Sequence, residues 1–291
     1  MGHRVATRRR PAHTAGRRRV APLSLLIVSM VVLGILVMLY PSATSWFSGV
    51  LQSKDGDRYV EVTDSIDPVS QQLQLQRAQD YNRSLADGSR IVDPFSALAE
   101  HTIKTDVPYW GLLDPAADGM MARIRIPKLS LKLPVFHGTA EDVLLRGAGH
   151  LQGTALLVGG EGTHSVVTAH AGLPQAEMFT ELDQMAVGDE IEVDVLSTTL
   201  VYRVTETSVV LPTETESLRA AAGNDQLSLV TCTPIGINSH RILVTAERVV
   251  PTPPDAGKEV DAVGFPWWAL GVLLTLAAAV VYLVRDAKAS A

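Results

Sequence analysis

The chain has 291 residues, of which 46% are hydrophobic and 19% charged, and its formal net charge is −6. The apolar fraction excludes a disordered chain, and a single cysteine, Cys232, excludes a disulfide framework and any multi-thiolate zinc or iron–sulfur site. Residues 41–264 carry 16 Lys and Arg against 30 Asp and Glu, so this acidic bulk would repel phosphates and no nucleic-acid partner is expected.

The N-terminus combines a basic run with an uncharged segment. Residues 1–20 hold seven arginines and no acidic residue, and residues 21–40 hold no charge. At 1.5 Å per residue, about 20 helical residues span a hydrocarbon core of roughly 30 Å. We therefore expect a cytoplasmic basic tail over 1–20 and a transmembrane helix over 21–40. The alternative is a cleaved signal peptide, but the stretch is longer than a usual signal core and no A-x-A sequence follows it.

A second uncharged segment lies near the C-terminus. Residues 265–284 have the same length as the first segment, with tryptophans and a tyrosine near the ends, where amphipathic rings favour the membrane interface. The tail 285–291 contains Arg285 and Lys288 and is expected to be cytoplasmic. The sequence thus predicts a protein of the cell membrane, held in the lipid bilayer by two helices, with residues 41–264 on the extracellular face.

The first part of the outside domain is predicted to be mostly irregular. Residues 41–68 are rich in Ser, Gly and Asp and are expected to form a tether. Within the region 69–118, residues 69–87 are predicted to form a helix that Gly88 ends. The remainder, 88–118, contains three prolines, and a loop of this length inside a domain is usually functional or disordered.

Residues 119–250 have the pattern of a β domain. Gly and Pro clusters separate eight strand candidates: ARIRIP, LKLPVF, TALLVGG, HSVVTAH, DEIEVDVL, TLVYRVTETSVVL, QLSLVTC and HRILVTAERVV. Short helices fit at 140–145 and 175–183. Many strands with few helices predict a mainly β fold, a barrel or a sandwich. Residues 251–264, with three prolines and little apolar content, are predicted to be a linker.

Cys232 and His170 occupy similar places in two predicted strands. Cys232 ends QLSLVTC and precedes Thr233-Pro234, and His170 ends HSVVTAH before a turn. If the two strands are neighbours, the imidazole can approach the thiol. A free thiol has a pKa of about 8.5, so it needs a nearby base or cation to react well. The competing interpretation is an inert, buried cysteine and a histidine with a structural role.

Arg241 opens the strand that follows Cys232. A strand, a loop and a returning strand would bring this arginine beside the thiol, where its guanidinium could orient a carbonyl and stabilise an oxyanion. Side chains alternate along a strand, so His240 and Arg241 cannot both face Cys232, and the spacing does not choose between them. The sequence contains no G-x-S-x-G, P-loop, G-x-G-x-x-G or H-E-x-x-H motif.

The residues around this cysteine resemble a known family. LVTCTPIGINSHRILV (229–244) resembles the active-site signature of sortases, and VVTAHAGLPQAEMFTELDQMAVGD (166–189) resembles their histidine region. IPKLSLKLPVFHGTAEDVL (126–144) and GAGHLQGTALLVGGEGTHS (147–165) match as well. The form of the signature, the second apolar segment and Asp93-Pro94-Phe95, which is similar to a lid motif, resemble class C, the pilin-polymerising sortases of Gram-positive bacteria. Ile235 departs from that class, which usually has tyrosine there.

This resemblance implies an eight-stranded sortase-type β-barrel over 119–250, with short helices, an N-terminal helix, a lid loop and two flanking transmembrane helices. It also assigns roles to single residues, with no cofactor and no metal. Cys232 would be the nucleophile, His170 the general acid/base and Arg241 the oxyanion or substrate-positioning residue, Thr231, Thr168 and Ile235 would be pocket candidates, and Asp93, Pro94 and Phe95 would form the lid.

The function implied is transpeptidation. The enzyme would cleave an LPxTG-type sorting signal between Thr and Gly through a thioacyl-enzyme and join it to a lysine amine of another pilin subunit. Three alternatives remain at this point: a housekeeping sortase that anchors surface proteins to the cell wall, a thiol protease, and a non-enzymatic membrane scaffold with an inert core cysteine.

Overall fold

The computed structural model describes residues 21–85, 91–96, 108–258 and 263–289. The predicted basic tail 1–20 and the predicted helix end at Gly88 lie outside the described residues. The chain divides into two units: a smaller one made of Met1–Ala43 with Pro266–Ala291, and a larger one, Thr44–Phe265.

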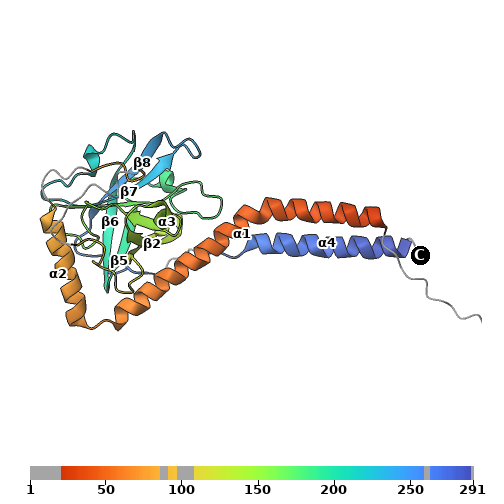
Figure 1. The fold of residues 1–291 in the computed structure, drawn as a ribbon, viewed down its shortest axis with the longest axis horizontal. Coiled ribbons are helices and arrows are strands. Elements are labelled where there is room, and N and C mark those ends of the chain that lie inside the picture. The colour runs from red at the N-terminus through yellow and green to blue at the C-terminus, as the bar shows by residue number, and fades with distance from the viewer. Residues whose placement is uncertain (1–20, 86–90, 97–107, 259–262, 290–291) are drawn as a thin grey trace, which may run out of the picture. The chain divides into compact units, whose positions relative to one another are not determined.

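The larger unit is built on a closed eight-stranded barrel with the strand order β1-β2-β3-β4-β7-β8-β6-β5 (Figure 1). Neighbouring strands are antiparallel except β2–β3 and β4–β7, which are parallel. This confirms the mainly β, eight-stranded barrel. The strands are β1 (Met120–Ile126), β2 (Leu131–His137), β3 (Ala148–His150), β4 (Thr163–Thr168), β5 (Glu190–Val195), β6 (Thr198–Val210), β7 (Asp225–Thr233) and β8 (His240–Arg248).

The helices differ in part from the sequence predictions. The short helix expected at 140–145 is α3 (Glu141–Leu144), whereas 175–183 forms turns that lead into the 3-10 turn η2 (Leu182–Gln184). Two further 3-10 turns are η1 (Pro127–Leu129) and η3 (Glu216–Leu218), and the longer helices are α1 (Pro22–Ser65), α2 (Pro68–Ser84) and α4 (Trp267–Ala289).

The segment 41–68, expected to be a tether, is helical as far as Ser65. Its part in the larger unit packs on the barrel through Tyr59, which is 1% exposed. The Tyr59 hydroxyl donates to the carbonyl of Met121 (2.8 Å) and accepts from the amide of Leu196 (2.9 Å). Packing against β1 and β5 thus overrides a local sequence whose Ser, Gly and Asp residues disfavour a helix.

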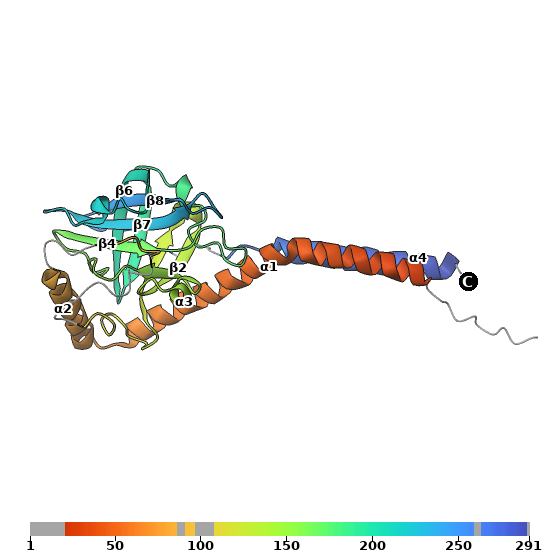
Figure 2. The same ribbon diagram turned by 45° about the horizontal axis from the view of Figure 1, so that its top comes forward.

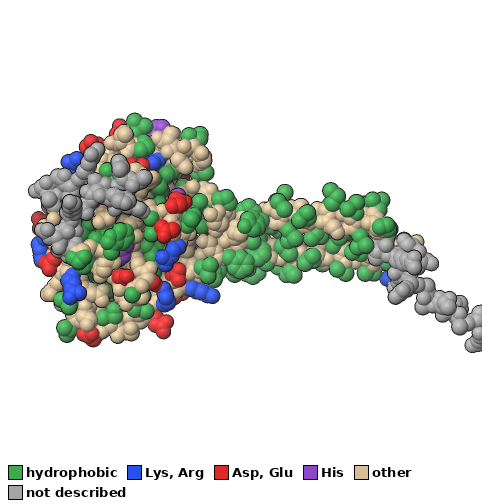
Figure 3. Space-filling model, in the orientation of Figure 1, with side chains coloured by type: hydrophobic (Ala, Val, Ile, Leu, Met, Phe, Trp, Pro, Cys, Tyr) green, Lys and Arg blue, Asp and Glu red, His purple; other side chains and the backbone are tan. Residues whose placement is uncertain are grey.

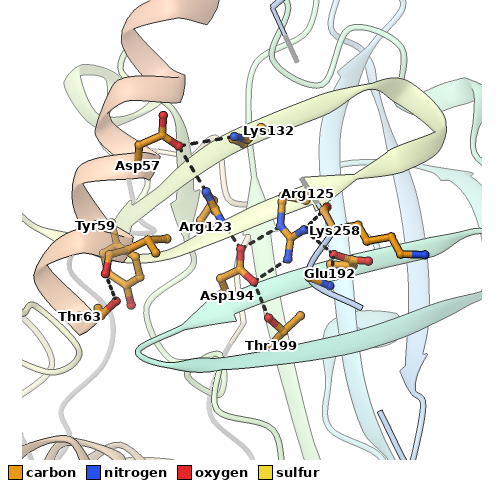
Figure 4. A network of polar contacts seen from close by, with 12 residues as sticks. Asp57, Tyr59, Thr63, Arg123, Arg125, Lys132, Glu192, Asp194, Thr199 and Lys258 are labelled. Carbon is orange, nitrogen blue, oxygen red and sulfur yellow. Dashed lines mark hydrogen bonds and ion pairs between the residues drawn. The ribbon is translucent and has the colours of Figure 1, made fainter. Parts of the chain in front are cut away.

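A buried ionic network joins this helix, the barrel and Lys258 of the predicted linker (Figure 4). Asp194 accepts from Arg123 (2.8 Å) and from both Nε and Nη2 of Arg125 (2.9 and 2.7 Å). Arg125 also donates to the carbonyl of Lys258 at 2.6 Å. The linker predicted over 251–264 is therefore attached to the barrel at Lys258. Its carbonyl is one of the acceptors that the buried Arg125 guanidinium needs.

The strand predicted at TALLVGG is absent, and β3 takes its place as the eighth strand. The reason is a side chain from α2. Asn82 accepts from the amide of Leu156 (2.7 Å) and donates to its carbonyl (3.2 Å), so this backbone pairs with a helix rather than with a strand. Helix α2 itself begins where Asp67 caps the amides of Val69 and Ser70, with proline in the first turn.

In the smaller unit, the first part of α1 and α4 are long and apolar enough to cross a membrane, with windows of mean hydropathy 2.7 and 2.2. They begin within two residues of the predicted starts at 21 and 265. Figure 3 shows hydrophobic side chains along the visible faces of these two helices, while Lys, Arg, Asp and Glu are scattered over the larger unit.

Candidate active site

Cys232, His170 and Arg241 lie on three adjacent parts of the barrel. Strand β7 runs between β4 and β8, and Figure 2 shows the three strands in this order. In the antiparallel pair β7–β8, Cys232 is directly opposite Arg241, and Thr233 is opposite His240. The register therefore places Arg241, and not His240, across from the thiol. Opposed residues of a pair project from the same face of the sheet.

His170 reaches the same level from the other side. Strands β4 and β7 are parallel with Thr168 opposite Val230, and His170 follows two residues after Thr168. Continuing this register by two residues brings His170 level with Cys232. The thiol thus has the imidazole-bearing segment on one side and the guanidinium-bearing strand on the other.

Two threonines fix the strand ends that carry these groups. The Thr168 hydroxyl donates to the carbonyl of Val230 (2.9 Å), and the Thr231 hydroxyl donates to the carbonyl of Ala169 (2.8 Å). Both threonines are fully buried. The two threonine hydroxyls, predicted to line the pocket, are therefore hydrogen-bonded to the backbone of the neighbouring strand. These bonds hold His170 and Cys232 in register.

All three guanidinium nitrogens of Arg241 donate to neighbouring groups. Its Nε and Nη2 donate to the two carboxylate oxygens of Asp93 (2.8 and 2.7 Å), a bidentate pair. Its Nη1 donates to the carbonyls of Asn238 and His240, both at 2.9 Å. Any oxyanion or substrate carbonyl would have to displace Asp93.

The residues Asp93-Pro94-Phe95 cover the site. The Phe95 ring centroid is 5.9 Å from that of His170, and the Arg241 guanidinium lies 5.1 Å from the Phe95 ring centre. A cavity of about 10 Å³ is left between Asp93-Pro94, the β6–β7 connection and Arg241, room for about one water molecule.

The lid also has an apolar and a polar attachment. Ile91, Val92 and Phe95 pack against a cluster of buried residues separate from the main core: Leu151, Val166, Leu218, Val230 and Leu243. The Thr215 hydroxyl donates to the carbonyl of Ile91 at 3.1 Å. Among the described residues, the segment 91–95 is thus held over the site by packing, by the hydrogen bond from Thr215 and by the Asp93–Arg241 ion pair.

The closed conformation favours the protonated form of the Cys232 thiol. Cys232 is 8% exposed, and burial raises its pKa; the carboxylate of Asp93 raises it further, while Arg241 lowers it. The net direction is upward. A raised pKa means less thiolate at neutral pH, and the thiolate is the nucleophilic form.

The remaining predicted residue, Ile235, lies on the β7–β8 loop beside the segment after His170. Ile235 is 56% exposed, and its side chain packs on Gly172. A Cβ atom at position 172 would lie 2.2 Å from Cγ2 of Ile235. Gly172 also has a φ of +74°. Only glycine fits there, so the contact between these two loops depends on it.

Glu141, which the sequence did not single out, contacts the candidate base. Its Oε2 lies 3.3 Å from Nε2 of His170. The position of α3 in the barrel, not a local sequence signal, creates this contact. By contrast His137, His150 and His164 are buried and hydrogen-bonded to backbone carbonyls, so they have structural roles.

Comparison with known proteins identifies the family. A family model described as the sortase domain matches residues 124–249. Sortase C-1 from Actinomyces oris, known from a crystal structure, is 44% identical in sequence to this chain. The match covers 62% of this chain and 98% of the Actinomyces chain, with a TM-score of 0.55. The chain belongs to the sortase family, whose members are cysteine transpeptidases.

The similar structures are class C sortases. The Streptococcus pneumoniae sortase C is 36% identical, covers 69% of this chain and 99% of its own length, and has a TM-score of 0.60. Among curated relatives, sortase A of Streptococcus agalactiae serotype III is 32% identical over 127 residues, which are 43% of this chain. The chain spans 51% of that relative's length.

Proposed function

We propose that this sortase is a membrane-anchored transpeptidase that cleaves an LPxTG-type sorting signal between Thr and Gly. It then joins the threonine carbonyl to a lysine amine of another pilin subunit. The observation that carries the proposal is the placement of Cys232 level with His170 on one side and opposite Arg241 on the other.

In the first step the Cys232 thiolate attacks the carbonyl carbon of the threonine. Arg241, freed from Asp93, donates to the developing oxyanion. The tetrahedral intermediate collapses by breaking the Thr–Gly C–N bond, and the His170 imidazolium gives its proton to the leaving amine. The products of this step are a thioacyl-enzyme and a peptide that begins with glycine.

In the second step a neutral lysine amine attacks the thioester carbonyl. The neutral His170 imidazole takes the proton that the attacking nitrogen releases, and the Cys232 thiolate leaves as the amide forms. The thioester preserves the acyl energy of the cleaved peptide bond, so no ATP is required. Water in place of the amine would give a free acid, the product of a thiol protease.

Substrate entry requires the lid to leave. Asp93 holds the same guanidinium that would bind the substrate carbonyl, and Phe95 lies beside the general acid. The closed lid therefore blocks the site, and substrate binds when the lid opens. A lid of this kind supports the pilin-polymerising class over a housekeeping sortase, as does the likeness to the S. pneumoniae sortase C, whose structure bears on pilin substrate specificity.

The two apolar helices support anchoring in the cell membrane. With the arginine-rich segment 1–20 on the cytoplasmic side, the larger unit would lie on the extracellular face, where surface proteins are processed. This arrangement places the thiol outside the cell, in reach of pilin subunits that have been exported.

The test uses the full chain in detergent micelles, an LPxTG peptide and a pilin domain with an accessible lysine. Mass spectrometry should detect a thioacyl adduct on Cys232 and an amide between the threonine and the lysine. The variant Cys232→Ala should give neither product, and its circular dichroism should match the parent. Amide formation by Cys232→Ala, or a free acid as the sole product of the parent, would contradict the proposal.

A further inference from the structure

Glu141 is the one carboxylate in contact with the His170 ring among the described residues. Its Oε2 is 3.3 Å from Nε2, and Nε2 is buried and has no hydrogen-bond partner there. The carboxylate lies within ion-pair distance of Nε2, although the contact does not have the geometry of a hydrogen bond.

Helix α3 determines where this carboxylate lies. Leu144 is 1% exposed and anchors the helix, with its side chain beside Gly149 of β3. Glu141 is one turn earlier, three residues away, and therefore on the same face of the helix as Leu144. The packing of α3 on the barrel thus directs Glu141 toward His170, although its side chain remains 71% exposed.

The other charged groups near His170 have partners of their own or the opposite role. The elements around it contribute Asp93 from the lid, Cys232 from β7, Arg241 from β8 and Glu177 from the following loop. Asp93 is paired with Arg241, and burial and Glu181 raise the pKa of Glu177, which disfavours its negative form. When the lid departs, Asp93 leaves with it and Glu141 stays.

We propose that Glu141 is a positioning residue for His170. It holds the imidazole ring in the position from which His170 protonates the leaving glycine amine in the acylation step. The inference rests on the proposed transpeptidation and adds the group that positions the general acid. Because Glu141 is exposed, its contribution is smaller than that of a buried catalytic carboxylate.

The test compares Glu141→Gln with Asp142→Asn in the full chain. Both variants remove one negative charge from α3, but among the described residues Asp142 forms no ion pair with His170. Release of the glycine fragment from an LPxTG peptide gives kcat and KM. For Glu141→Gln we expect kcat to fall about threefold with KM unchanged, because an exposed ion pair contributes little, against the roughly 10²–10⁴ of a general acid itself. Glu141→Asp should restore part of the lost kcat. Asp142→Asn should match the parent.

The outcomes separate this inference from the function on which it rests. A parent enzyme without thioacyl formation contradicts the transpeptidase proposal. An active parent with an unchanged kcat in Glu141→Gln overturns the positioning role alone. A change in KM only would make Glu141 a substrate contact, which also overturns it.

Discussion

Asp93 and Cys232 compete for Arg241. The guanidinium is bonded twice to the carboxylate of Asp93, while the thiol opposite it would gain from the same positive charge as a thiolate. Closure of the lid is therefore both a steric and an electrostatic device. The carboxylate neutralises the cation and adds a negative charge that disfavours the thiolate.

Asp93→Asn should raise the reactivity of Cys232. Burial raises the thiol pKa and Asp93 raises it further, so removing this charge lowers the pKa and leaves Arg241 to lower it more. Well below the pKa, the thiolate fraction rises about tenfold when the pKa falls by one. The pH dependence of iodoacetamide alkylation should therefore move to lower pH. Asp80→Asn, which removes an exposed carboxylate paired with Arg83, is the control. Identical curves for Asp93→Asn and parent would contradict this mechanism.

His150 should make the larger unit acid-sensitive. Its ring is fully buried, donates to the carbonyl of Ala155 and contacts Tyr109, and burial lowers its pKa from 6.5 to about 4. A histidine with a depressed folded-state pKa stabilises the fold above the unfolded value and loses that contribution as pH falls. Between pH 6.5 and 4 the free energy of unfolding should fall by about 3 kcal/mol from this group.

Urea unfolding at several pH values, followed by circular dichroism, measures this dependence. His150→Gln should flatten it, and His240→Gln, at the loop end of β8, should not. The imidazole resonances of His150 in the unmodified protein give a second measure. A ring that titrates near its ordinary pKa of about 6.5 would refute the prediction.

At the scale of elements, an ionic network centred on Asp194 joins the barrel to helix α1 and to the linker at Lys258. This carboxylate is 6% exposed and binds both Arg123 and Arg125, whereas Asp57 of α1 approaches Arg123 at 3.6 Å and is 62% exposed by its side chain. A buried charge that loses its partner is costly, while an exposed ion pair contributes little.

Asp194→Asn should therefore destabilise the larger unit by on the order of 3 kcal/mol, and Asp57→Asn by less than about 1 kcal/mol. Thermal unfolding of the two variants under one set of conditions compares them directly. Equal losses would mean that burial does not set the strength of this network. The detachment of Lys258 and the linker from Arg125 should accompany the loss in Asp194→Asn, and increased proteolysis after residue 250 would reveal it.

At the scale of the whole molecule, the division at 43/44 and 265/266 separates the apolar helices from the unit that contains the site. All the hydrogen bonds and ion pairs described around Cys232 lie within Thr44–Phe265. A fragment of residues 44–258, which keeps Tyr59 and the Lys258 carbonyl, should thus fold without the two apolar helices.

Its unfolding midpoint should lie within a few degrees of that of the full chain in detergent, and it should form the thioacyl adduct with a soluble peptide. The fragment should remain in the soluble fraction of lysed cells, whereas the full chain should sediment with the membranes. A fragment that fails to fold would show that the apolar helices also stabilise the barrel.

Local sequence patterns predicted a mainly β fold and the sortase family. Alternating apolar residues between turn clusters predicted a barrel or a sandwich, uncharged runs of about 20 residues predicted the two apolar helices, and the signature around Cys232 pointed to the family and its barrel. These features are local, because strand period, helix length and motif spacing are properties of short segments.

Which groups meet at the site follows from tertiary packing. The register of β7 and β8 places Arg241, and not His240, opposite Cys232. In the closed conformation Arg241 is hydrogen-bonded to Asp93, and the packing of α3 places Glu141 beside His170. Long-range packing also made a helix of the expected tether, through Tyr59, and removed a predicted strand, through Asn82. Each of these outcomes depends on a contact between residues far apart in the chain, whose energy exceeds the weak local preferences that sequence patterns record.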